Sequence, residues 1–125
     1  MKIRIRDNSI RLRLTRSEVE RFGKDKYIKG ITEFGDAVFT YAMCIDGAVT
    51  EISADLTDNK ITMHIPASIA ETFLATDAVG FQNEQLLANG KKLFLLFEKD
   101  FKCMDDEVLG DQSDNYENPS VASKK

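Results

Sequence analysis

The most constraining feature of this sequence is an internal likeness between two segments that follow the same pattern. Residues 8–22 (NSIRLRLTRSEVERF) resemble residues 59–73 (NKITMHIPASIAETF) without a gap. Five identities carry the likeness: Asn8, Ile10, Ser17, Glu20 and Phe22 return as Asn59, Ile61, Ser68, Glu71 and Phe73. Each copy alternates apolar and polar residues and then changes to helical spacing, which predicts a strand followed by a helix. A unit that leaves its apolar face open packs against its twin, so we predict an internally duplicated fold.

Turn residues divide the rest of the chain into further short elements. We expect a hairpin over residues 2–6 and 9–14, a three-stranded meander over residues 27–34, 37–45 and 49–56, and strands over residues 60–65, 79–82 and 91–98. Thr15 and Glu18 have capping-box spacing for a first helix, which we expect to stop at Gly23. A second helix is expected to begin at Pro66. Every connection is short, which favours antiparallel pairing throughout.

These elements predict an α+β fold in one domain. The domain is expected to span residues 1–103, with an acidic, polar tail over residues 104–125. The strands form one curved antiparallel sheet or an eight-stranded barrel, with two helices packed over its apolar side. The side chains expected on that side are Ile3, Ile5, Ile10, Leu12, Leu14, Phe39, Tyr41, Met43, Ile61, Met63, Ile65, Leu93, Leu95 and Phe97.

Composition narrows the class of protein. A chain of 125 residues with 42% hydrophobic and 30% charged residues can bury its own core without disulfides or metals. The charged N-terminus and the short apolar runs indicate neither a signal peptide nor a membrane span, and the two cysteines are expected to be reduced, so we expect a cytoplasmic protein. A net charge of −4 disfavours nucleic acid as a partner.

Polar side chains should share the opposite side of the sheet, where an anion or a metal ion could bind. The candidates for an anion are Lys2, Arg4, Arg6, Arg11, Arg13 and His64. Guanidinium groups bind phosphate with paired hydrogen bonds, and Glu51 with Asp55 could hold a divalent cation such as Mg²⁺. The alternative is that these charges only keep the outer face of the sheet in water.

No catalytic motif is present at recognisable spacing. The glycines are scattered at turn positions and form no phosphate loop, and neither Cys44 nor Cys103 has a paired metal ligand nearby in sequence. We therefore predict a binding or interaction module without catalytic residues and without a required cofactor. The alternative is a binder or weak hydrolase of polyphosphate or nucleotide anions. A second copy of the chain and a phosphate-containing small molecule are the partners that fit these two hypotheses.

Two resemblances accompany this interpretation. The SIRLRLT segment, the EKDFKC segment and the DNYENP segment resemble a family of short uncharacterised bacterial proteins, which implies a shared fold and no established activity. The order strand, helix, three strands, occurring twice, is similar to the triphosphate-tunnel (CYTH-like) superfamily. That resemblance implies an eight-stranded barrel around a channel for metal and triphosphate. Here the glutamates of the superfamily's first strand are replaced by Lys2, Arg4 and Arg6.

Overall fold

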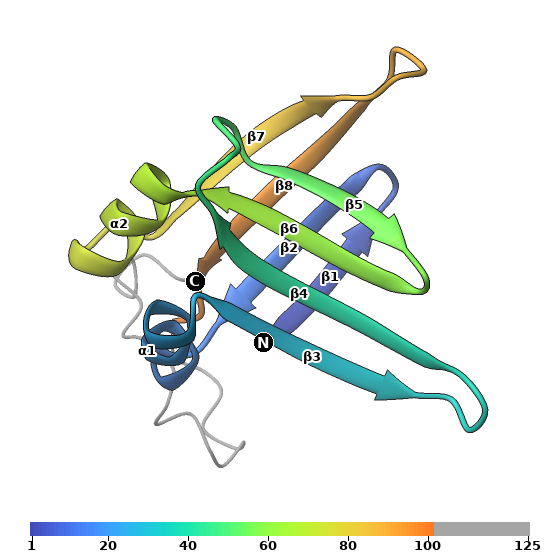
Figure 1. The fold of residues 1–125 in the computed structure, drawn as a ribbon, viewed down its shortest axis with the longest axis horizontal. Helices are drawn as coiled ribbons and strands as arrows, with labels where there is room; N and C mark the ends of the chain where they lie inside the picture. The colour runs from blue at the N-terminus through green and yellow to red at the C-terminus, as the bar shows by residue number, and fades with distance from the viewer. Residues whose placement is uncertain (102–125) are drawn as a thin grey trace, which may run out of the picture.

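The computed structural model of the protein describes residues 1–101 and shows two sheets with two helices (Figure 1). The strands are β1 (Lys2–Arg6), β2 (Ser9–Leu14), β3 (Tyr27–Glu33), β4 (Val38–Asp46), β5 (Ser53–Thr57), β6 (Lys60–Pro66), β7 (Gly80–Leu86) and β8 (Lys92–Lys99). The helices are α1 (Arg16–Asp25) and α2 (Ala67–Ala75). The predicted tail over residues 104–125 lies outside the described residues.

Each sheet combines one hairpin from the first half of the chain with one from the second half. Sheet A has the order β1-β2-β8-β7, and sheet B has the order β3-β4-β6-β5. The pairs inside each hairpin are antiparallel. The two central pairs, β2 with β8 and β4 with β6, are parallel. Both sheets are therefore mixed, and each depends on contacts between residues far apart in the sequence.

The register of the first hairpin repeats in β5-β6 with the spacing of the sequence likeness. Lys2 pairs with Arg13 between β1 and β2, and Ser53 pairs with His64 between β5 and β6, each residue lying 51 positions further on. The same spacing separates residues 8–22 from residues 59–73. An origin by duplication stays a prediction, but the first hairpin of each half pairs equivalent residues.

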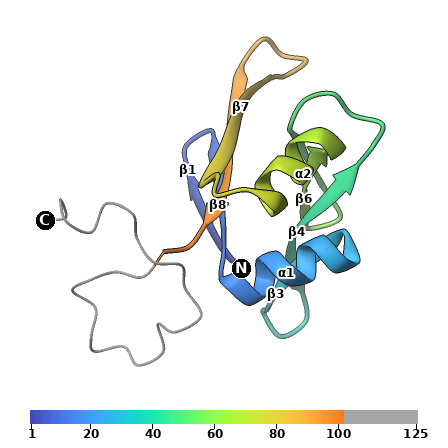
Figure 2. The ribbon, with the colours of Figure 1, turned by 90° about the vertical axis from the view of Figure 1, so that its left-hand side faces the viewer.

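One hydrophobic core lies between the two sheets and includes side chains from both helices. Its largest fully buried side chains are Phe22, Phe73, Phe97, Leu12, Leu14, Met43, Ile52, Met63, Ile65 and Leu95. Phe73 of α2 meets Phe97 of β8 edge to face, with ring centroids 4.8 Å apart. Both helices sit at the same end of the two sheets, the end at which β2 and β6 finish (Figure 2).

The structure corrects the expected sheet. Among residues 1–101 there is no closed barrel and no single curved sheet, because the strands divide into two four-stranded sheets. The meander over residues 27–56 is also wrong: β5 pairs with β6, and β6 lies between β4 and β5. Short connections dictate the antiparallel hairpins only. They do not determine which hairpins lie side by side, and in this fold parallel strand pairs join one hairpin to the next.

Two smaller expectations are also corrected. Helix α1 continues through Gly23 to Asp25, and Lys26 takes the left-handed cap conformation with φ 60°. Gly23 serves helix packing instead, because a Cβ there would lie 3.2 Å from a methyl carbon of Leu74 in the other helix. The helices close one end of the sheets and leave the rest of the apolar side to sheet-on-sheet packing. Ile5 consequently stays 55% exposed, although most of the predicted core is buried.

Polar contacts tie the sheets together near both edges of sheet A. The Tyr41 hydroxyl of β4 donates to the Met1 carbonyl beside β1 at 3.0 Å. On the other edge, the Asn83 amide of β7 donates to the Ile52 carbonyl at 2.8 Å, and the Ala54 N–H of β5 donates to the Gln85 side chain at 2.8 Å. These hydrogen bonds satisfy polar groups where the sheets meet, and they connect sheet A to sheet B at both edges.

Candidate functional site

The outer face of sheet A carries the predicted basic residues in cross-strand rows. Ile10, Leu12 and Leu14 of β2 are buried, so Arg11 and Arg13 face outward. Arg4 pairs with Arg11, which in turn pairs with Leu96 of β8. The next row runs from Arg6 through Ser9 to Phe94. The face therefore places arginines beside two large apolar side chains.

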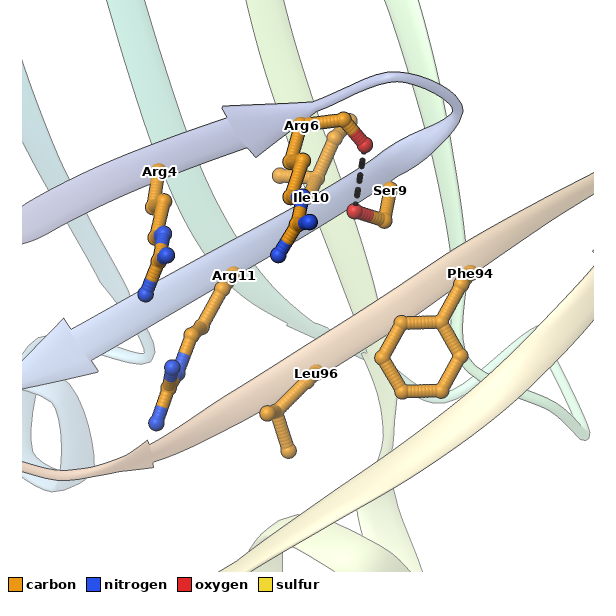
Figure 3. Close-up of a pocket in the computed structure, with 7 residues that line it drawn as sticks. All are labelled: Arg4, Arg6, Ser9, Ile10, Arg11, Phe94 and Leu96. Carbon is orange, nitrogen blue, oxygen red and sulfur yellow. Dashed lines mark hydrogen bonds between the residues drawn. The ribbon is translucent and has the colours of Figure 1, made fainter.

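A shallow cavity of about 190 Å³ lies over these two rows. Its lining residues are Arg4, Arg6, Ser9, Ile10, Arg11, Phe94 and Leu96. The side chains of Arg4, Arg6 and Arg11 extend on the same side of the sheet as Phe94 and Leu96 (Figure 3). Within residues 1–101, no carboxylate pairs with the guanidinium group of Arg4 or Arg6. We call this group of residues the arginine site.

The neighbouring row of the same face is neutralised by carboxylates. Glu98 Oε2 lies 2.6 Å from Arg11 Nη2 and 3.1 Å from Arg13 Nε, so one carboxylate serves two guanidinium groups. Asp100 lies 3.0 Å from Lys2 Nζ and 3.8 Å from Arg13 Nη2. Both acidic side chains are largely buried, with 12% and 4% of their surface exposed. These ion pairs hold Arg11 toward β8 and occupy Arg13 and Lys2.

The predicted anion set is thus split between three places. Arg4, Arg6 and Arg11 share the arginine site, whereas Lys2 and Arg13 are paired with Asp100 and Glu98. His64 lies on sheet B, at the position equivalent to Arg13.

His64 sits on the outer face of sheet B between two carboxylates. Its Nε2 lies 2.7 Å from Asp55 Oδ2, and its Nδ1 lies 3.2 Å from Asp46 Oδ2. Cys44 Sγ is 3.4 Å from the same Nδ1, so His64 contacts the thiol through Nδ1 and the Asp55 carboxylate through Nε2. Burial raises the pKa of the Cys44 thiol, and the charges of Asp46 and Asp55 raise it further. The cluster therefore keeps the thiol protonated, which opposes a role as nucleophile.

The two predicted metal ligands are not brought together by a shared contact. Asp55 is engaged by His64, and Glu51 lies exposed in the segment between β4 and β5. In the part of the chain that the structure describes, no three His, Cys, Asp or Glu side chains are placed to hold a metal ion. Asp55 and Cys44 approach opposite nitrogens of His64, so they cannot meet at one ion. Binding of Mg²⁺ at Glu51 and Asp55 stays a prediction.

Comparison with known proteins places the chain in a family. The sequence profile of DUF7009, a family of unknown function, matches residues 1–120. The chain belongs to that family. No curated protein and no solved structure matches it. DUF7009 thus carries no activity to transfer, and nothing found supports the resemblance to the triphosphate-tunnel superfamily. No described helix of this DUF7009 chain has the length and apolar character needed to cross a membrane.

Sequence reasoning missed the β8 side of the arginine site and the Cys44–His64 contact. A signal for the first was available: residues 92–99 (KLFLLFEK) are apolar at both odd and even positions, which indicates apolar side chains on both faces. Phe94 and Leu96 are the outward ones. No local pattern could place Cys44 beside His64, because β4 and β6 become neighbours only through parallel pairing.

Proposed function

We propose that this protein is a binding module whose arginine site takes an anionic ligand with phosphate groups, without hydrolysing it. One observation carries the proposal: the guanidinium groups of Arg4 and Arg6 lie beside an apolar surface. Both groups are free of carboxylate partners among the described residues, whereas every other basic residue of this face is engaged. Salt bridges satisfy the structural need for charge pairing, so the unpaired arginines are available to a ligand.

The chemistry of the site favours a nucleotide or a polyphosphate. Arginine offers a planar fork of donors that matches two phosphate oxygens. Phe94 and Leu96 provide an apolar surface on which a base can rest. Charge-assisted hydrogen bonds contribute about 1.5–3 kcal/mol each, so two of them, about 3–6 kcal/mol together, support a dissociation constant between about 40 μM and about 6 mM. The expected setting is the cytoplasm, where such anions occur.

Among the described residues, the carboxylates of this face already have basic partners. Glu98 contacts Arg11, and its Oε2 is shared with Arg13. Glu84, opposite Phe94 on β7, lies 3.8 Å from Lys92 Nζ. A general base needs a lone pair within hydrogen-bond reach of the attacking water. Binding is therefore the proposed activity, and hydrolysis is the alternative that the same samples can test.

Isothermal titration of the full chain with ATP and with tripolyphosphate, each with and without Mg²⁺, tests the proposal. Binding that falls about tenfold or more in the double variant Arg4→Ala/Arg6→Ala is expected. The matched control is Lys29→Ala/Lys91→Ala, which removes the same charge from two exposed lysines outside the site. Equal losses in both double variants, or no binding to the unmodified chain, would overturn the proposal. Release of inorganic phosphate would replace it with the hydrolase hypothesis.

A further inference from the structure

The space between the two sheets is closed at one end and open at the other. The helices occupy the end where β2 and β6 finish, and the hairpin turns of β1-β2 and β5-β6 lie at the opposite end (Figure 1). A cavity of about 430 Å³ opens there between the sheets. It is lined by Ile5 and Ile10 of sheet A, Leu56 and Ile61 of sheet B, and Leu87 and Leu93 of the β7-β8 hairpin. We call it the hairpin-end cavity.

The two walls of this cavity are equivalent residue pairs of the two halves. Ile5 pairs with Ile10 across β1 and β2, and Leu56 pairs with Ile61 across β5 and β6. Ile10 and Ile61 belong to the buried core, so the cavity has the core as its floor. Ile5 and Leu56 lie on the inward faces but are 55% and 69% exposed. The sheets therefore leave apolar surface uncovered where a core would otherwise continue.

The rim of the hairpin-end cavity is acidic. Asp7 and Asn8 of the β1-β2 turn line the rim, and among the described lining residues there is no basic side chain. The negative charge of the rim comes from Asp7, which lies exposed in this turn, because Asp55 also lines the cavity but its carboxylate contacts His64 on the outer face of sheet B. An apolar anion would meet repulsion at this rim, and an apolar cation would meet attraction.

We infer that the hairpin-end cavity is a second binding site, which takes a small apolar molecule carrying a cationic group, such as an alkylammonium ion. The volume falls within the range of small-molecule pockets, and the lining has the usual form of an apolar body with a few polar groups. The preferred charge is opposite to that of the arginine site. The inference is therefore independent of the proposed phosphate binding.

A second copy of the chain is the other occupant to consider. The exposed apolar side chains surround a cavity that reaches down to the core. A flat surface for self-association would not need such a cavity. The hollow fits a guest that enters between the sheets better than a partner that lies across them. Self-association through this end is retained as an outcome of the test.

Methyl NMR of the full chain labelled at isoleucine and leucine tests the inference with octylammonium as the probe. Saturable shifts are expected at Ile5, Ile10, Leu56 and Ile61, with no shift at Ile31, an exposed isoleucine of sheet B. Octanoate, which has the same chain length, is expected to bind at least about threefold more weakly because of the acidic rim. Asp7→Asn should narrow that difference. Shifts spread evenly over exposed methyl groups, or equal binding of octanoate, would overturn the inference.

Two substitutions and a matched control test whether octylammonium binds in the hairpin-end cavity itself. Leu56→Ser removes one wall and should weaken octylammonium about tenfold, whereas Leu86→Ser, at a leucine of the same 69% exposure outside the lining, should not. Ala54→Leu should fill the cavity and abolish binding, and its folding is checked by the unchanged methyl spectrum of the helical end. Equal effects of Leu56→Ser and Leu86→Ser would refute the site. Sedimentation showing a dimer that Leu56→Ser dissociates, with no octylammonium bound, would assign this end to a second copy.

Discussion

Replacing Glu98 with glutamine should lower stability and strengthen anion binding in the same protein. Glu98 Oε2 accepts a hydrogen bond from Arg11 Nε at 2.6 Å and also faces Arg13. Breaking a fully buried ion pair costs about 3–5 kcal/mol, and an exposed pair contributes about 0–1 kcal/mol. Arg11 and Arg13 are 34% and 37% exposed, so we expect a loss of about 1–3 kcal/mol in the free energy of unfolding, measured by urea denaturation.

The gain in anion affinity follows from the same geometry. An anion bound over the row of Arg4, Arg11 and Leu96 would lie one row away from Glu98. Glu98 follows Leu96 by two residues on β8, which is a spacing of about 7 Å along the strand. Repulsion between unit charges at that separation is about 0.6 kcal/mol in water and about 2.4 kcal/mol at an effective dielectric constant of 20. Glu98→Gln should therefore tighten tripolyphosphate binding by roughly threefold to sixtyfold, more at low salt.

The two effects of Glu98→Gln have opposite signs: stability falls while anion affinity rises. Glu33→Gln on sheet B is the control, because it changes net charge equally at an exposed position. Weaker binding in Glu98→Gln would show that the anion does not sit over the row of Arg4 and Arg11. Unchanged stability would show that the shared carboxylate contributes nothing to the fold.

Three further predictions concern stability and reactivity. Gly80→Ala should cost about 1–3 kcal/mol in urea denaturation, since its Cβ would lie 2.4 Å from the Phe97 carbonyl oxygen, whereas Gly47→Ala, with open space around it, should cost little. In a Cys103→Ser background, Cys44 should react with iodoacetamide at pH 8 more slowly than a free thiol, and faster once Asp46→Asn/Asp55→Asn is added. Burial alone would raise the pKa of Glu18, but hydrogen bonds from the Met1 amino group and the Thr15 N–H outweigh it and lower this pKa below its usual value of 4.5. Its stabilising contribution is then full above pH 4.5 and is lost as the pH falls through the lowered value, so the stability difference between the unmodified chain and Glu18→Gln should shrink below pH 4.5; a constant difference would contradict this.

The local elements could be predicted from the sequence because their causes are local. Alternation of apolar and polar residues located β1 and β2 at the observed bounds, and the same alternation placed Leu12 and Met63 in the core. Thr15 and Glu18 marked the start of α1, where the Thr15 N–H now donates to the Glu18 carboxylate at 2.8 Å. Arg4, Arg6 and Arg11 were placed on one face because residues two apart on a strand share a face.

What could not be predicted depends on contacts between distant segments. No periodicity shows that β8 lies beside β2, and this single pairing brings Phe94, Leu96 and Glu98 to the arginines. It also explains why Lys2 and Arg13 are paired and not free. Gly23 was interpreted as a helix stop since its packing against Leu74 of α2 is invisible in the sequence of α1 alone.

The exchange of hairpins between halves has a consequence for both proposed sites. Sheet A requires β1-β2 from the beginning of the chain and β7-β8 from its later part. The parallel pair β2-β8 joins these two hairpins, and a long stretch of chain connects them. Neither half contains a complete sheet, so neither can build the arginine site, whose cations come from the first half and whose apolar surface comes from the second. The hairpin-end cavity has walls from both halves for the same reason. Ligand binding at either site would therefore favour only the fully assembled sandwich, and each ligand should stabilise the whole folded chain as one unit.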